Sequence, residues 1–267
     1  MSGDQAADRF RAWAGAILAH HLHRAGDGGA AQPVAVYQTS TMAALLDGIY
    51  DGDVIIAELL THGDFGLGTF NHLNGEMVIL DGTCYHLRAD GHATIASGQD
   101  KTPFAAVLWF RPDKTITITR LSDRAALTGL IDGAIPSPNL TYALRVSGSF
   151  TRVRTRTVMA QRPPYPPLTE ATADEPVTDL ARVTGTLAGF RTPAYEQGIS
   201  VAGYHLHFLT QDRKHGGHVL DFALDHGEVA ICTASELHLS LPRTAPFLSA
   251  DLSPADTNAQ IKQTEGG

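Results

Sequence analysis

Two histidines separated by one residue, with a third eleven residues later, constrain the fold of this chain more than any other feature. His205 and His207 lie in an apolar run. Because side chains alternate along a β-strand, this spacing places them on one face of a strand. The polar residues 211–217 predict a turn, and residues 219–224 predict a returning strand. A hairpin that folds about the middle of this turn places His218 directly opposite His207.

This arrangement predicts a metal site on the hairpin. Three imidazoles with a fourth position left open are the ligand set of a catalytic Zn²⁺ site rather than of a closed structural site. The alternative interpretation is that each residue is an ordinary half-buried strand histidine. Convergence of all three on one face favours the metal site.

Composition restricts what such a site can bind. The chain has 267 residues, of which 43% are hydrophobic and 18% charged, as in ordinary soluble globular proteins. Its 20 basic and 28 acidic residues give a formal net charge of −8, and no basic cluster stands out. Nucleic acid is therefore not expected as a partner. An anionic substrate needs local positive charge from a metal or a specific arginine.

The sequence also indicates a compartment. Cys84 and Cys232 are the only cysteines and lie far apart, which favours a reducing environment. No apolar run approaches the roughly 18 residues of a membrane span. The N-terminal residues lack the pattern of a secretory signal. We expect a cytoplasmic protein with no membrane association.

The first part of the chain predicts helices on an antiparallel or mixed sheet. An amphipathic helix over residues 5–23 precedes a Gly/Ala linker. Asn74-Gly75 predicts a hairpin turn before an apolar strand over residues 77–80. Further helices are expected at 42–49, after a possible hydroxyl cap, and at 54–61, and further strands at 105–110, 115–119 and 146–153.

The proline-rich segment Arg162–Pro167 divides the chain, because it can form neither a helix nor a central strand. We interpret it as a connector, although a proline-rich recognition peptide is the alternative. Beyond it, residues 168–183 predict a helix, and a pair of strands is expected at 229–232 and 237–241.

The predicted fold class is therefore α+β (mixed α/β). We expect two domains, each built around a mixed, largely antiparallel sheet, with the metal site on a hairpin of the second. The predicted boundaries are 1–33 for the N-terminal helix and linker, 34–165 for the first sheet domain, and 166–267 for the second domain with its C-terminal tail.

Two charged residues occupy unusual positions. Glu76 lies between a turn glycine and an apolar strand, and its parity with Val78 and Leu80 could direct it inward. A solvent-facing charge is the alternative. Arg156 follows Arg152 and Arg154 in alternation, for which an exposed basic stripe is the simpler interpretation.

Several segments together resemble one enzyme family. They are Gly63–Asn71, Leu73–Met77, Thr155–Val158 and Gly203–Phe208, with the spacing from His205 and His207 to His218. In these segments the chain is similar to the acetolactate decarboxylases. The resemblance runs from about Tyr37 to the C-terminus and leaves out the N-terminal helix.

The resemblance implies two mixed α/β domains, a Zn²⁺ ion and a homodimer. It implies metal ligands at His205, His207 and His218. Glu76 would be an active-site glutamate, Arg156 an active-site arginine, and Thr69 a residue lining the pocket. The family also brings a glutamate from its C-terminal tail into the site, for which Glu265 is the candidate.

The implied reaction is zinc-dependent decarboxylation of 2-acetolactate to acetoin and CO₂ through a metal-stabilised enediolate. A Zn²⁺ ion with neutral ligands keeps its full charge and can act as a Lewis acid where negative charge develops. Arg156 would hold the substrate carboxylate. Glu76 and Glu265 would transfer protons, and the sequence does not assign their separate roles.

Two other functions fit the same histidine pattern. His-x-His on a strand is also typical of cupin-like β-barrel enzymes, which include metal-dependent oxygenases and isomerases. That pattern usually has a glutamate soon after the pair, whereas Leu209-Thr210-Gln211 stands there. The other alternative is a metal-containing protein that binds a small ligand without turnover.

Overall fold

One large mixed sheet organises the part of the chain that can be described. The computed structural model describes residues 32–252 and 257–265. Ten strands follow one another in the order β10-β11-β12-β13-β1-β8-β3-β4-β5-β6, and β9 adds to β13. The pairing of β1 with β13 is parallel and the other pairings in this sheet are antiparallel. The predicted mixed, largely antiparallel character is confirmed.

The strands differ widely in length. Those of the large sheet are β1 Val34–Thr39, β3 Phe65–Thr69, β4 Glu76–Leu80, β5 Thr83–Leu87, β6 Ala93–Ile95, β8 Phe104–Leu108, β9 Lys114–Ile118, β10 Thr141–Arg156, β11 Val177–Thr192, β12 Gly203–Thr210 and β13 Gly216–Ser240. A separate pair consists of β2 Val54–Ile55 and β7 Lys101–Thr102.

Helices are few and short. They are α2 Met42–Leu46, α3 Ile56–Leu59, α4 Arg124–Ala134, α5 Leu168–Ala171, α6 Ala245–Ser249 and α7 Thr257–Glu265, with 3-10 turns at Asn71–Leu73 and Ala194–Glu196. None of these described helices is long and apolar enough to cross a membrane. The structure is thus mostly β-sheet with few helices.

The long strands bury apolar side chains on both of their faces. On β10, Tyr142 and Leu144 belong to one core cluster, whereas Ala143 between them belongs to another. β12 divides in the same way, because Leu206 and Phe208 join the first cluster and Leu209 joins the second. His205 and His207 have the parity of Leu209, so they point toward the second cluster.

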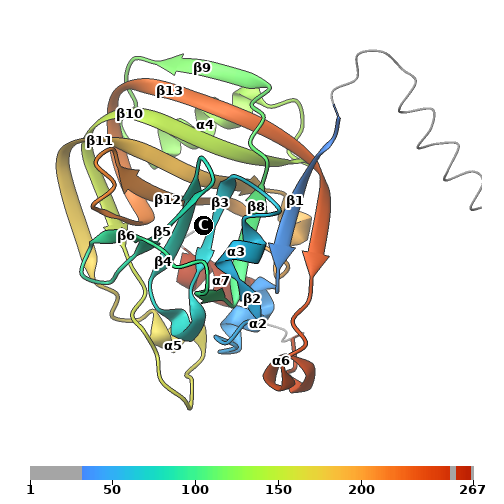
Figure 1. Cartoon of the computed structure of the whole chain (residues 1–267). Coiled ribbons are helices and arrows are strands. Elements are labelled where there is room, and N and C mark those ends of the chain that lie inside the picture. The colour runs from blue at the N-terminus through green and yellow to red at the C-terminus, as the bar shows by residue number, and fades with distance from the viewer. Residues whose placement is uncertain (1–31, 253–256, 266–267) are drawn as a thin grey trace, which may run out of the picture. The chain divides into compact units, whose positions relative to one another are not determined.

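The sheet folds back over this second face. β3 and β4 pack against β11 and β12 without being their hydrogen-bonded neighbours, as Figure 1 illustrates. The short helices α2, α5 and α7 contact one another at one end of these strands. The histidine-bearing face of β12 is therefore covered by strands from the first part of the chain.

Two expectations from the sequence are wrong. Residues 168–183 form only the short helix α5, and β11 already begins at Val177. Pro176 stops a helix, and the β-branched residues after it pair with β10 instead. The expected pair of strands at 229–232 and 237–241 is one continuous strand, β13, whose register shifts against β10 accommodate its length.

Other expected elements are found with shifted limits. Thr41 caps α2 by accepting a hydrogen bond from the Ala44 amide, but the helix ends at Leu46. Residues 54–59 divide into β2 and α3. The strands expected at 77–80, 105–110, 115–119 and 146–153 correspond to β4, β8, β9 and β10. The helix predicted over residues 5–23 lies outside the described residues.

The predicted boundary at residues 165 and 166 does not interrupt the sheet. β10, which precedes it, pairs along its whole length with β11, which follows it. Division of residues 34–267 into two domains stays a prediction.

Candidate active site

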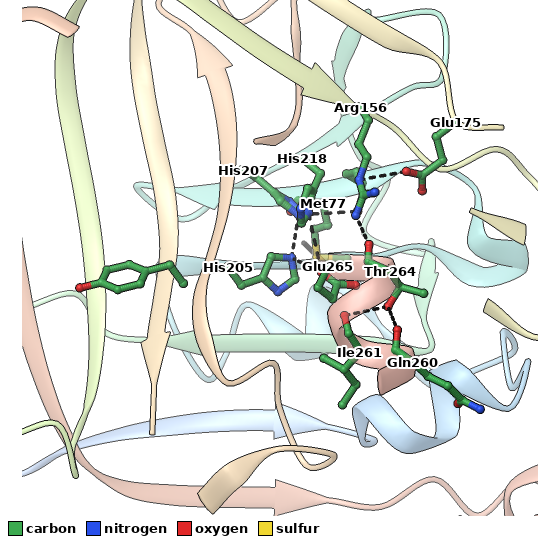
Figure 2. A network of polar contacts seen from close by, with 12 residues as sticks. Met77, Arg156, Glu175, His205, His207, His218, Gln260, Ile261, Thr264 and Glu265 are labelled. Carbon is green, nitrogen blue, oxygen red and sulfur yellow. Dashed lines mark hydrogen bonds and ion pairs between the residues drawn. The ribbon is translucent and has the colours of Figure 1, made fainter. Parts of the chain in front are cut away.

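The three histidines converge as the hairpin predicts. β12 and β13 form an antiparallel hairpin in which His207 is the register partner of His218. His205 Nε2 lies 3.2 Å from His207 Nε2. One donor atom from each of the three rings lies within 4.8 Å of the other two. Figure 2 shows the rings facing a common point.

A glycine allows the strand carrying His218 to approach its neighbour. A Cβ atom added at Gly217 would lie 2.8 Å from the backbone oxygen of Arg156 and 2.9 Å from the Thr155 side chain. Such contacts are too short for an alanine. Gly217 thus permits the close pairing of β13 with the end of β10, where Arg156 is the register partner of His218.

The protonation state of the rings suits metal binding. His207 Nδ1 donates a hydrogen bond to the Met77 carbonyl oxygen at 2.7 Å, which leaves Nε2 with its lone pair. Burial is the main reason why the pKa values of all three histidines are lowered, that of His205 to about 3. His218 Nε2 is buried without a hydrogen-bond partner. Three neutral imidazoles with an unpartnered buried nitrogen fit a divalent cation.

Two glutamates flank the histidine cluster. Glu76 Oε2 lies 3.6 Å from His207 Nε2. Glu265 Oε2 lies 3.4 Å from His205 Nε2 and 3.8 Å from His218 Nδ1. Burial raises the pKa of both carboxyl groups, that of Glu265 to about 7. The predictions that Glu76 points inward and that the C-terminal tail reaches the cluster agree with these positions.

A tight hairpin directs Glu76 into the cluster. β3 and β4 pair antiparallel, with Thr69 opposite Glu76. The Thr69 hydroxyl donates to the Gly75 carbonyl oxygen at 2.7 Å, and Gly75 adopts a φ of 82°. A glycine is favoured there because a positive φ strains other residues. Thr69 therefore holds the turn immediately before Glu76, and both residues line one small cavity.

Arg156 links the end of β10 to the C-terminal helix. Its Nη2 donates to the backbone oxygen of Thr264 in α7, next to Glu265. Its Nε lies 2.9 Å from Glu175 Oε2. The alternative of an exposed basic stripe does not hold for Arg156, whose side chain is 16% exposed, whereas Arg152 and Arg154 are 48% and 50% exposed.

Sequence reasoning missed Glu175. It lies in the turn between α5 and β11, inside a segment expected to be helical. Its side chain is 4% exposed, and burial raises its pKa to about 7. The one signal is its place directly before Pro176, which marks the end of the short helix rather than a functional position.

A small cavity collects these groups. Its polar lining includes Thr69, Glu76, Arg156, His205, His218 and Glu265. Glu175, Thr172 and Thr264 also line it. The apolar side chains of its wall are Met42, Leu45, Leu73, Phe104, Val158 and Leu168. Hydrogen bonds and charges act strongly in such surroundings, because little water screens them.

Comparison with known proteins decides the family. Residues 36–254 match the sequence profile of alpha-acetolactate decarboxylase. The alpha-acetolactate decarboxylase of Raoultella terrigena is 49% identical over 230 residues, covering 86% of this chain and 89% of that protein. The protein of that name from Bacillus subtilis strain 168 is 46% identical over 236 residues, covering 88% of this chain and 92% of that protein.

This chain belongs to the alpha-acetolactate decarboxylase family. It is therefore an enzyme, and the suspected resemblance is confirmed. The crystal structure of the Bacillus subtilis strain 168 alpha-acetolactate decarboxylase superposes with a TM-score of 0.85 at 45% identity, covering 87% of this chain and all of that one. Membership favours a decarboxylase over a cupin-like enzyme or a ligand-binding protein.

The residues that line the cavity extend beyond the range matched by the family profile. The alpha-acetolactate decarboxylase profile ends at residue 254, so the three histidines, Glu76 and Arg156 lie inside it. Glu265 lies beyond it, although its carboxylate lies beside His205. The position of this tail glutamate therefore follows from the folded structure rather than from the profile.

Proposed function

We propose that this enzyme decarboxylates 2-acetolactate to acetoin and CO₂, with a Zn²⁺ ion held by His205, His207 and His218. The observation that carries the proposal is the convergence of three neutral imidazoles, of which His207 and His218 are buried and His205 is largely buried, beside Arg156 in a member of this family. A divalent cation held by these three residues would supply a Lewis acid for the negative charge that develops as CO₂ leaves. Zn²⁺ suits three imidazole ligands with further coordination left for substrate.

Arg156 is proposed to bind the substrate carboxylate. A guanidinium donates directed, charge-assisted hydrogen bonds that match a carboxylate, and the chain's net charge of −8 makes local positive charge necessary. Holding the carboxylate fixes the carbon–carbon bond that breaks. When CO₂ leaves, the electron pair of that bond moves toward the former ketone.

Glu76 and Glu265 are proposed to move the protons. One carboxylate accepts the proton of the substrate hydroxyl and returns it to the same oxygen after CO₂ has left. The other carboxyl group delivers a proton to the carbon that lost CO₂, which yields acetoin, and takes up a new proton from solvent. Burial raises the pKa of both groups, that of Glu265 to about 7, which favours the protonated form relative to an exposed glutamate and supports a role in proton transfer. Thr69 supports the turn that places Glu76.

The proposed reaction has a direct test. Purified protein is mixed with racemic acetolactate, and acetoin is followed before metal removal, after chelation and after Zn²⁺ is added back. We expect activity to disappear with the metal and to return with it. Full acetoin production by protein shown to be free of metal would refute the proposed role of the ion.

We further propose a cytoplasmic homodimer. Free, buried Cys84 and Cys232 support a reducing compartment. The dimer rests on the resemblance to the family. Light scattering of the purified protein tests it, and a monomer at micromolar concentration would contradict it.

A further inference from the structure

Glu175 is a buried acid that the proposed reaction does not use. It comes from the turn before β11 and approaches Arg156 from the side away from the histidines, as Figure 2 shows. Its Oε2 lies 2.9 Å from Arg156 Nε, and its side chain is 4% exposed. Burying a carboxyl group costs free energy unless a partner compensates. The contact with Arg156 is the compensation that the structure shows for Glu175.

The contacts of Arg156 divide its guanidinium into two edges. Nε faces Glu175 and Nη2 donates to the Thr264 carbonyl oxygen, so the edge formed by these two nitrogens is engaged by the protein. Within the described residues, Arg156 makes its polar contacts through Nε and Nη2. Nη1 and the second hydrogen of Nη2 form the other edge. That edge remains for a carboxylate ligand, which guanidinium groups bind in a two-point manner.

Fixing one edge orients the other. An arginine side chain has several rotatable bonds and loses rotamer freedom when it binds a ligand. Contacts on both Nε and Nη2 remove that freedom before the substrate arrives. Such preorganisation raises affinity because less order has to be imposed during binding.

We propose that Glu175 is a positioning residue, which holds Arg156 by Nε so that the Nη1–Nη2 edge receives the substrate carboxylate. The inference rests on the proposed function of Arg156. The three glutamates around the cavity then have different roles. Glu76 and Glu265 lie against the histidines, whereas Glu175 contacts Arg156.

A matched pair of substitutions tests the proposal. Glu175→Met keeps the approximate volume and removes the acceptor, whereas Glu175→Gln keeps an acceptor oxygen for Arg156 Nε. We expect Glu175→Met to raise KM for acetolactate by about tenfold, because the Arg156 guanidinium loses its buried ionic partner. Glu175→Gln recovers part of this loss. Unfolding temperature and metal content, measured in parallel, identify a variant that fails to fold.

Ligand binding distinguishes positioning from a merely structural role. Acetoin lacks a carboxylate, whereas 2,3-dihydroxy-2-methylbutanoate carries one on a similar carbon skeleton. Calorimetry with Glu175→Met should show weaker binding of the carboxylate ligand and unchanged binding of acetoin. Equal weakening of both ligands, or no weakening of either, would overturn the proposal. The readout does not need turnover, so it is separate from the acetolactate assay, whose failure would instead refute the proposed function.

A double-mutant cycle asks whether Glu175 acts through Arg156. In an Arg156→Lys background, the Nε contact no longer exists, so adding Glu175→Met should change carboxylate binding no further. If both substitutions weaken binding independently and their effects add, Glu175 does not position Arg156. The same calorimetric titration measures all four proteins.

Discussion

The hairpin β12–β13 and the C-terminal helix α7 bring groups to the same cavity by different means. His207 and His218 lie on strands that are paired on both sides, and His207 is further held by the Met77 carbonyl oxygen. Glu265 lies at the end of a nine-residue helix. That helix is held by buried Ile261 and Thr264 and by the contact of Thr264 with Arg156.

This contrast separates two parts of the proposed chemistry. Side chains on central strands are displaced only when much of the sheet unfolds, whereas a short terminal helix can detach with a smaller free-energy cost of local unfolding. We therefore expect metal binding to be robust toward changes in the tail. Proton transfer through Glu265 should be sensitive to them.

Removing a proposed metal ligand from a central strand should have the largest effect. His207→Ala should abolish both Zn²⁺ binding and acetoin formation, because two imidazoles remain and a buried carbonyl loses its donor. Metal analysis and the acetoin assay measure the two effects. His226→Ala, at a β13 residue that is 69% exposed, is the matched control and should behave as the wild type. Normal zinc content in His207→Ala would refute the ligand assignment.

Glu76→Gln should separate binding from turnover. The amide keeps the shape of the side chain but cannot exchange a proton, so the rate should fall by roughly 10²- to 10⁴-fold. Zinc content should remain that of the wild type, because the three imidazoles are untouched. A rate within threefold of the wild type would exclude Glu76 from proton transfer.

Loosening α7 tests the other side of the comparison. Ile261 is 1% exposed and packs in a cluster with Met42 and Leu45. Ile261→Ala should cost about 2 kcal/mol of packing, which lowers the docked population and turnover by up to about thirtyfold. Zinc content should not change. Leu248→Ala, at a residue that is 71% exposed, is the control. Loss of zinc together with activity would show that tail and hairpin are not separable.

Thr69→Val should have a moderate effect. It removes the hydroxyl that donates to the Gly75 carbonyl oxygen and leaves that buried acceptor unpaired, at a cost of about 1 to 3 kcal/mol. Denaturant unfolding measures this loss, and the acetoin assay measures any displacement of Glu76. Thr61→Val removes an exposed hydroxyl that also donates to a carbonyl and should be nearly silent. Equal effects of the two substitutions would contradict the role of Thr69.

The smallest expected effect is a pH dependence at His86. Burial lowers the pKa of His86, whose Nε2 donates to the Asn74 carbonyl oxygen at 2.5 Å. The unfolded chain then binds more protons than the folded one below the ordinary pKa of about 6.5. The free energy of unfolding should therefore decrease as the pH falls below that value. His86→Gln keeps a donor without titrating, and urea unfolding should show a weaker decrease for it; identical slopes would contradict this role.

Local patterns explain which features the sequence predicts. The alternation of His205 and His207, the polar turn and the Asn74-Gly75 turn are short-range signals, and the structure places the corresponding residues as expected. The helix expected over residues 168–183 fails because pairing with β10 decides the structure after Pro176. Propensity within one segment does not contain that information.

Long-range docking explains what the sequence leaves out. Glu265 was a candidate by resemblance alone, since the tail has no motif and its approach depends on the packing of Ile261. Glu175 has no pattern at all, because its role depends on contact with Arg156, which lies nineteen positions earlier at the end of β10. Such contacts become visible only when the fold is known.

The most direct test of the central claim is an anomalous scattering map of the active enzyme at the zinc absorption edge. We predict one peak, about 2.0 to 2.1 Å from a nitrogen of each of His205, His207 and His218. A fully active enzyme with no peak among these rings, or with its metal elsewhere, would contradict it.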